Sequence, residues 1–121
     1  MTDTSTLART TDDTSAVAIV ADGRTIASAD VQGRGTSVRV SFSISHGHLP
    51  IQVRRRLVDA VFELPEVRGS RAVLATLPLG DVDLLNGLRA HCTAMSTRAA
   101  GATCLVDAIM DIRDVDEGAE R

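Results

Sequence analysis

Three histidines and two cysteines are the residues of this chain that could bind a transition metal. His46 and His48 are two residues apart, so both imidazoles could reach one ion if the chain there is extended. His91 and Cys92 are adjacent, and on a helix such neighbours point about 100° apart. Zinc needs three or four ligands. We therefore predict no metal site and keep a small metal-binding protein that uses His46 and His48 as an alternative.

The sequence gives little support for covalent catalysis. Cys92 and Cys104 lie in apolar patterns and form no Cys-x-x-Cys pair, so we expect two buried, reduced thiols. No Gly-x-Ser-x-Gly turn is present to expose a serine nucleophile. The glycines form neither a dinucleotide-binding fingerprint nor a phosphate loop. We predict no catalytic residues, no cofactor and a protein that is not an enzyme.

The composition narrows the possible partners and the location. The chain has 13 basic residues, all of them arginine, no tyrosine or tryptophan, and a formal net charge of −3. This usage is typical of a GC-rich, actinobacterial-type genome, and it disfavours nucleic acids and anionic lipids as partners. We expect the basic run Arg54–Arg56 to be a solvated helix face. No apolar run approaches the roughly 18 residues of a membrane span, and the N-terminus lacks an apolar signal-peptide core. We expect a bacterial, cytoplasmic protein.

The 121 residues suit one folded domain with two tails. Residues 1–15 are rich in Thr, Ser and Asp and have few aliphatic side chains, so we predict a disordered N-terminal tail. Residues 16–112 carry the apolar patterns of a single α/β domain. Residues 113–121 are mostly charged, and we predict a frayed C-terminal tail.

The first half of the domain is predicted to contain three strands and a helix. Asp22-Gly23 between two apolar runs favours a hairpin, since both residues tolerate positive φ. Residues 38–44 alternate strictly between apolar and polar, with Val40 and Phe42 on the inner side. Residues 51–64 have the apolar spacing of a helix, which Pro65 ends.

The second half continues with strand, helix and strand. Residues 72–77 are almost continuously apolar, as in a central strand. Asp81 is a suitable N-cap for a second helix, whose apolar side would carry Leu84, Leu85, Leu88, Cys92 and Met95. Residues 103–110 form the last predicted strand. The order is β-β-β-α-β-α-β, which predicts a two-layer α/β sandwich with a mixed five-stranded sheet and two helices on one face.

Two helices cover only one face of such a sheet, so the other face must meet water, a tail or a partner. Its apolar side chains are rimmed by hydroxyls and charges, a mixture typical of association sites. We predict a small non-enzymatic interaction or regulatory module that binds a protein partner, most simply a second copy in a homodimer. The predicted partner-binding residues on this face are Arg39, Ser41, Leu74, Thr76, Leu105, Asp107 and Ile109.

A second interpretation comes from the order of elements over residues 38–110. The strand–helix–strand–helix–strand order, with Asn86-Gly87-Leu88 in the second helix, resembles the STAS domains, which are anti-sigma-factor antagonists. The resemblance implies function at the loop before the second helix. However, residues 78–88 contain no serine or threonine, so a STAS-like relative of this sequence would lack the phosphorylation switch.

Overall fold

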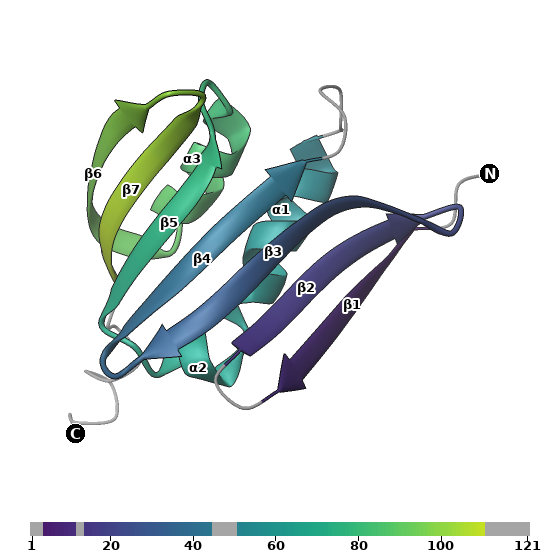
Figure 1. Ribbon diagram of the computed structural model, residues 1–121, viewed down its shortest axis with the longest axis horizontal. Helices are drawn as coiled ribbons and strands as arrows, with labels where there is room; N and C mark the ends of the chain where they lie inside the picture. Colours follow the sequence, from purple (N-terminus) through teal and green to yellow (C-terminus); the bar gives the residue numbers. More distant parts are fainter. Residues whose placement is uncertain (1–3, 12–13, 45–50, 111–121) are drawn as a thin grey trace.

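The computed structural model describes residues 4–11, 14–44 and 51–110 (Figure 1). Within these ranges the chain forms seven strands and three helices. In chain order they are β1 (Thr4–Thr11), β2 (Thr14–Ala21), β3 (Arg24–Arg34), β4 (Ser37–Ile44), α1 (Ile51–Phe62), α2 (Pro65–Arg68), β5 (Ala72–Pro78), α3 (Val82–Arg89), β6 (Cys92–Ala100) and β7 (Thr103–Met110).

The seven strands form one mixed sheet with the order β1-β2-β3-β4-β5-β7-β6. Only β4 and β5 pair in parallel, and every other neighbouring pair is antiparallel. The helices lie together behind the sheet in Figure 1. An α/β fold with a mixed sheet is therefore confirmed. The predicted five strands and the order β-β-β-α-β-α-β are wrong, because two strands and a short helix were missed.

One missed strand, β1, lies in the segment predicted to be a disordered tail. Residues Thr4–Thr11 pair with Thr14–Ala21 along their whole length. A strand at a sheet edge is held by its backbone hydrogen bonds, so it forms here with few aliphatic side chains. The other predicted tail, residues 113–121, lies outside the described residues.

The other missed strand, β6, lies in the segment predicted to continue the second helix. The helix α3 ends at Arg89, and the strand begins at Cys92. Cys92 and Met95 are three residues apart, which imitates helical spacing. In the structure they belong to a sheet-edge strand with mostly exposed side chains. An edge strand has no strict apolar alternation to reveal it.

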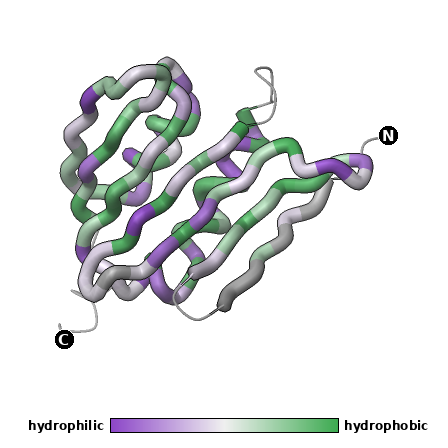
Figure 2. Tube along the Cα trace, in the orientation of Figure 1, coloured by the Kyte–Doolittle hydropathy of each residue, from purple (hydrophilic) through white to green (hydrophobic). Residues whose placement is uncertain are grey.

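The β2–β3 hairpin and the inner face of β4 match the sequence prediction. Asp22 and Gly23 have φ values of 54° and 76°, which a type I′ turn requires. Along β4, Val38, Val40 and Phe42 are buried beneath the helices. The polar residues between them are exposed on the opposite, open face, and Figure 2 shows this alternation along the strands.

The two longer helices pack closely on each other above the sheet. A Cβ atom added to Gly87 of α3 would lie 3.1 Å from Cγ2 of Val58 in α1. Val58 is completely buried, as are Leu57, Leu84 and, almost, Leu88. This contact fixes how the two helices lie relative to one another, and so where their N-termini lie at one end of the sheet.

Candidate functional site

The parallel strands β4 and β5 separate near their C-terminal ends. They pair from Ser37 with Ala72 to Ser41 with Thr76, and no further pair joins them. However, β4 continues to Ile44 and β5 to Pro78. Figure 1 shows the arrows of β4 and β5 diverging toward their tips. We call the region between residues 42–44 of β4 and residues 77–78 of β5 the split.

In the split, the backbone N–H and C=O groups that β4 and β5 direct toward each other have no strand partner. On their other sides, Phe42 and Ile44 pair with β3, and Leu77 and Pro78 pair with β7. Such backbone donors and acceptors need hydrogen-bond partners. In open α/β sheets, ligands bind outside the carboxyl ends of parallel strands. The split therefore has the position and the backbone chemistry of a ligand site.

The N-terminus of α1 lies at the same end of the sheet as the split (Figure 1). This helix follows β4 in the chain, and its first turn, Ile51–Arg54, contains no acidic residue. A helix N-terminus carries partial positive charge and free N–H groups, so it attracts anions. The N-terminus of α3 differs, because Asp81 caps it and Asp83 lies in its first turn. Of the two, α1 is the helix whose N-terminus is suited to a phosphate.

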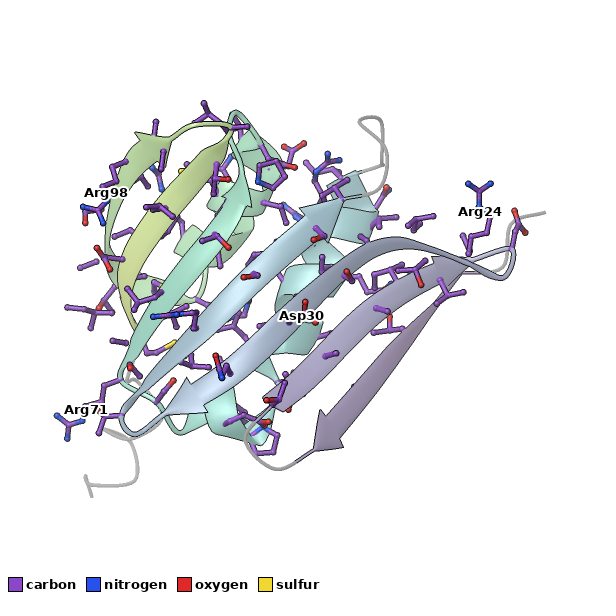
Figure 3. All side chains as sticks on the ribbon, in the orientation of Figure 1. Arg24, Asp30, Arg71 and Arg98 are labelled. Atoms are coloured by element: carbon purple, nitrogen blue, oxygen red, sulfur yellow. The ribbon has the colours of Figure 1, made fainter. Side chains whose placement is uncertain are left out.

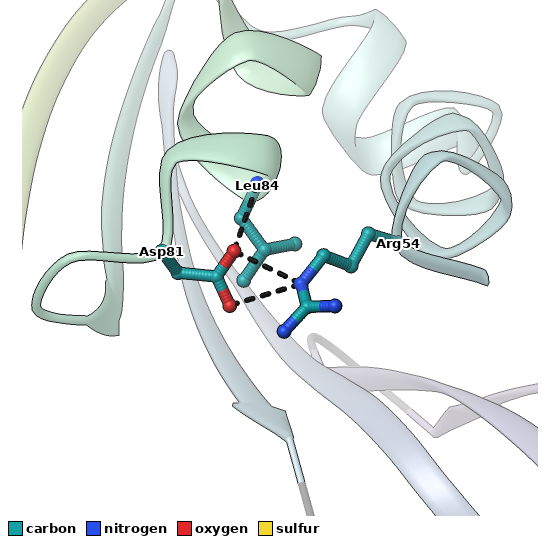
Figure 4. Close-up of polar contacts among 3 residues, drawn as sticks. All are labelled: Arg54, Asp81 and Leu84. Atoms are coloured by element: carbon teal, nitrogen blue, oxygen red, sulfur yellow. Dashed lines mark hydrogen bonds and ion pairs between the residues drawn. The ribbon is translucent and has the colours of Figure 1, made fainter. Parts of the chain in front are cut away.

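A buried ion pair joins the starts of these two helices (Figure 4). The Nε atom of Arg54 lies 2.9 Å from Oδ1 and 3.1 Å from Oδ2 of Asp81. Oδ1 of Asp81 also accepts a hydrogen bond of 3.1 Å from the backbone N–H of Leu84. The prediction of Asp81 as an N-cap is confirmed. The prediction that all three arginines of Arg54–Arg56 are solvated is wrong for Arg54, which is 8% exposed.

Two of the predicted partner-binding residues meet at the base of the split. Thr76 donates a hydrogen bond of 3.1 Å from its hydroxyl to Oγ of Ser41. Both residues belong to the last paired position of β4 and β5. Their contact is exposed on the open face. These hydroxyls therefore mark the point where the split begins.

The other predicted residues lie on the open face beside this pair. The register places Leu74 between Arg39 on β4 and Asp107 on β7, so the arginine and the aspartate are not strand neighbours. Leu105 lies opposite Thr76, and Ile109 lies opposite Ala72. Leu74 and Ile109 are 40% and 55% exposed. The assignment of these residues to the open face is supported, and partner binding by them stays a prediction.

The histidines and cysteines do not form a cluster in the described part of the chain. His46 and His48 lie outside the described residues. His91 lies 3.0 Å from Oδ1 of Asp59 through its Nε2, and its ring stacks on Phe62 with centroids 4.4 Å apart. Cys104 is buried, whereas Cys92 is only partly buried. Within residues 4–11, 14–44 and 51–110, no three His, Cys, Asp or Glu residues are placed to hold a metal ion.

None of the helices in the described ranges is long and apolar enough to cross a membrane.

Comparison with known proteins identifies the fold. No protein-family model matches the sequence, and no curated protein matches it. Solved structures do match. An acetyltransferase of the GNAT family from Streptococcus pneumoniae superimposes with a TM-score of 0.59 at 8% identity, over 84% of this chain and 69% of that one. An N-acetyltransferase from Staphylococcus aureus gives 0.59 at 9% identity, over 83% and 68%.

A third similar structure includes a cofactor. It is a Salmonella typhimurium protein described as an acetyltransferase and solved with acetyl-CoA, with a TM-score of 0.58 at 13% identity. The match covers 84% of this chain and 66% of that one. Another match, the GNAT domain of a Streptomyces lividans protein, is covered over 61% of its length. The chain therefore has the fold of the GNAT acetyltransferases, and the matches span between 61% and 69% of the length of these structures.

This fold contradicts the functional predictions from the sequence. A non-enzymatic interaction or regulatory module, and the statement that the chain is not an enzyme, are wrong on this comparison, since the similar structures are consistently acetyltransferases. The same comparison contradicts the alternatives of a STAS-like relative and of a small metal-binding protein. The sequence reasoning missed the split and the Arg54–Asp81 pair. One feature of the sequence could have pointed to this end of the sheet. The clear strand at residues 38–44 is followed by a helix whose first turn has no acidic residue.

Proposed function

We propose that this protein binds an acyl-CoA thioester in the split between β4 and β5 and transfers its acyl group to an amine. The observation that supports this most is the separation of the two parallel strands after Ser41 and Thr76, in a fold that it shares with acetyltransferases.

The residues around the split fit the chemical groups of coenzyme A. Its pantetheine arm carries two amides, and an extended amide chain can hydrogen-bond to an unpaired strand edge as an added strand does. Its diphosphate suits the N-terminus of α1, which has no competing carboxylate in its first turn. Arg55 and Arg56 are exposed on the same helix. Their guanidinium groups are suitable partners for the ribose phosphate.

The bound thioester would supply an activated acyl carbon, to which the amine nitrogen bonds as the carbon–sulfur bond breaks. The amine loses a proton and the departing sulfur accepts one, so the exchange is balanced. The contribution of this chain is positional. An unpaired backbone N–H on β4 would donate to the thioester carbonyl oxygen, where negative charge grows during attack. The sheet edges on both sides would hold the reacting carbon at the base of the split.

We also propose a cytoplasmic location, because the proposed donor, an acyl-CoA, is a cytoplasmic metabolite. The earlier expectation of a homodimer is untested by the structure.

Substitution of the two glutamines tests the anion site at α1. The chain contains only Gln32 and Gln52, and both are exposed. Gln52→Glu puts a carboxylate in the first turn of α1, where it stabilises the helix by about 0.3–1 kcal/mol but repels a diphosphate. We expect acetyl-CoA affinity, measured by isothermal titration calorimetry, to fall about tenfold, which corresponds to 1.4 kcal/mol.

The matched control is Gln32→Glu on β3, which makes the same chemical change beside Arg39, away from the split. We expect its affinity to equal that of the wild type. A wild-type protein that does not bind acetyl-CoA at millimolar concentration would contradict the proposed function. Equal losses in both variants would show that net charge, and not the N-terminus of α1, controls binding.

A further inference from the structure

The edge strand β6 is exposed along its outer edge and on both faces of the sheet. It pairs with β7 on one side, and no described strand lies on its other side. Seven of its nine side chains are exposed. Thr97 and Ala99 lie opposite the buried residues Val106 and Cys104, on the helix side of the sheet, and yet both are exposed. The helices therefore leave this part of β6 uncovered.

The sequence of β6 has few of the features that stop a sheet edge from pairing with another chain. Natural edge strands are protected by charged side chains, prolines, bulges or a covering helix. The strand β6 has one charged residue, Arg98, and no proline, and its bulge lies at its start, between Cys92 and Ala94. From Met95 to Ala100 it pairs regularly with β7. Such an edge is a template for an added strand.

The opposite edge of the sheet, at β1, has different surroundings. A groove of about 460 Å³ lies between β1 and the outer side of α1. Four charged side chains of α1 line it, namely those of Arg55, Arg56, Asp59 and Glu63. Charged groups beside an edge strand oppose pairing with another chain. Of the two edges, β6 is therefore the one that we expect to pair.

Two opposite charges near this edge have no partner within the described ranges. Arg98 of β6 and Asp107 of β7 are both exposed, and neither forms an ion pair there. The register places Arg98 opposite Leu105 and Asp107 opposite Ser96. Figure 3 shows Arg98 at the outer edge of β6. The positive charge thus lies on the edge strand and the negative charge one strand further in, an arrangement that can be complementary to itself.

A two-fold axis at Thr97 would bring these charges together. Two antiparallel copies of β6 centred there place Arg98 opposite Ser96 of the second copy. Asp107 of that copy is the next residue in the same row, so its Cα atom lies two strand spacings, about 10 Å, from that of Arg98. The two long side chains can close this gap above the small serine. A register centred on Arg98 would instead place two arginines opposite each other, which is unfavourable.

We propose that a second copy of this chain pairs with the outer edge of β6 in the antiparallel register centred on Thr97. In this dimer, Arg98 of each copy forms an ion pair with Asp107 of the other, and one continuous sheet runs through both subunits. The proposal does not depend on acyl transfer, because β6 lies at the edge of the sheet and the split lies between β4 and β5.

Single cysteines test the register. Thr97→Cys places two thiols opposite each other at the axis, with Cα atoms about 4.5–5.5 Å apart, which suits a disulfide. Ala99→Cys is the matched control on the same side of the strand, where the two thiol-bearing residues would be about 13 Å apart along the strand direction. We expect a disulfide-linked dimer of Thr97→Cys on a non-reducing gel after mild oxidation. Ala99→Cys should give no more than the wild type, whose Cys92 and Cys104 set the background.

Charge reversal tests the ion pairs. Arg98→Glu places a carboxylate near Asp107 of the other copy, so the dissociation constant of the dimer should rise about tenfold, as two attractive pairs become repulsive. Analytical ultracentrifugation measures it. Adding Asp107→Arg exchanges the two charges and should restore the wild-type affinity. The matched control, Arg24→Glu, makes the same change at the start of β3, away from β6 (Figure 3), and should leave the affinity unchanged.

Four results would overturn the proposal. The first is a wild-type protein that stays monomeric at millimolar concentration. The second is a dimer in which Thr97→Cys crosslinks no better than Ala99→Cys, which would place the interface elsewhere. The third is an equal loss of affinity in Arg98→Glu and Arg24→Glu, which would show an effect of net charge. The fourth is a double variant that dimerises no better than Arg98→Glu. If circular dichroism shows that a charge variant is unfolded, the crosslink at the exposed position 97 still decides the register.

Discussion

Arg54 and Asp81 join the starts of the two longer helices at the end of the sheet where the proposed donor site lies. The pair is almost completely buried, with side chains 9% and 7% exposed. It connects the first turn of α1 to the cap of α3. Asp81 also accepts the backbone N–H of Leu84, so one carboxylate satisfies donors from both helices. This arrangement keeps a carboxylate at α3 and leaves the start of α1 for an anion.

Breaking this pair is expected to destabilise the fold strongly. Arg54→Ala leaves the carboxylate of Asp81 buried without its counter-charge, and such a loss costs about 3–5 kcal/mol. Urea unfolding followed by circular dichroism measures the free energy of unfolding. Arg55→Ala, on the exposed side of the same helix turn, is the matched control and should change it by less than about 0.5 kcal/mol. Similar values for both variants would show that the ion pair does not stabilise the protein.

The helical spacing of the sequence could have predicted that Arg54 is buried, although we did not predict it. Arg54 lies three, four and seven residues before Leu57, Val58 and Val61, which is the spacing of one helix face. The run of three arginines suggested instead a uniformly solvated surface. The partner of Arg54 was harder to predict, because Asp81 is 27 residues away in the sequence. In addition, the N-cap of the second helix already accounted for an aspartate at position 81.

At the level of elements, strands with strict alternation or a defined turn were predictable, and edge strands were not. The Asp22-Gly23 hairpin and the inner face of β4 follow from local chemistry. The edge strands β1 and β6 depend on pairing with β2 and β7. Their own side chains carry little pattern. Local sequence therefore indicated the centre of the sheet and missed both of its edges.

The first strand is expected to contribute to stability, contrary to what a disordered tail would do. Removal of residues 2–11 deletes all of β1 and leaves the backbone edge of β2 unpaired. We expect the melting temperature to fall by about 4–8 °C for each kcal/mol lost. Differential scanning calorimetry on the full and shortened chains measures this change. An unchanged melting temperature would mean that β1 adds nothing to the stability of the sheet.

For the whole molecule, the sequence predicted an α/β protein with an open sheet face. It did not predict the split between β4 and β5. The split depends on where two strands stop pairing, and Ser41 and Thr76 are 35 residues apart. No local pattern records that separation. The residues chosen for partner binding lie beside the split because they share the open face, and two of them, Ser41 and Thr76, mark its base.

The proposed position of the donor site, in the split and at the start of α1, can be located by amide shifts on addition of acetyl-CoA. We expect ¹⁵N NMR to show the largest changes at the amides of residues 42–44, at Leu77 and in the first turn of α1, residues 51–53. The amides of β1 and β6, at the edges of the sheet, should stay unchanged. Saturable binding with its largest shifts at those edges, or no shifts at all at millimolar acetyl-CoA, would contradict a donor site in the split.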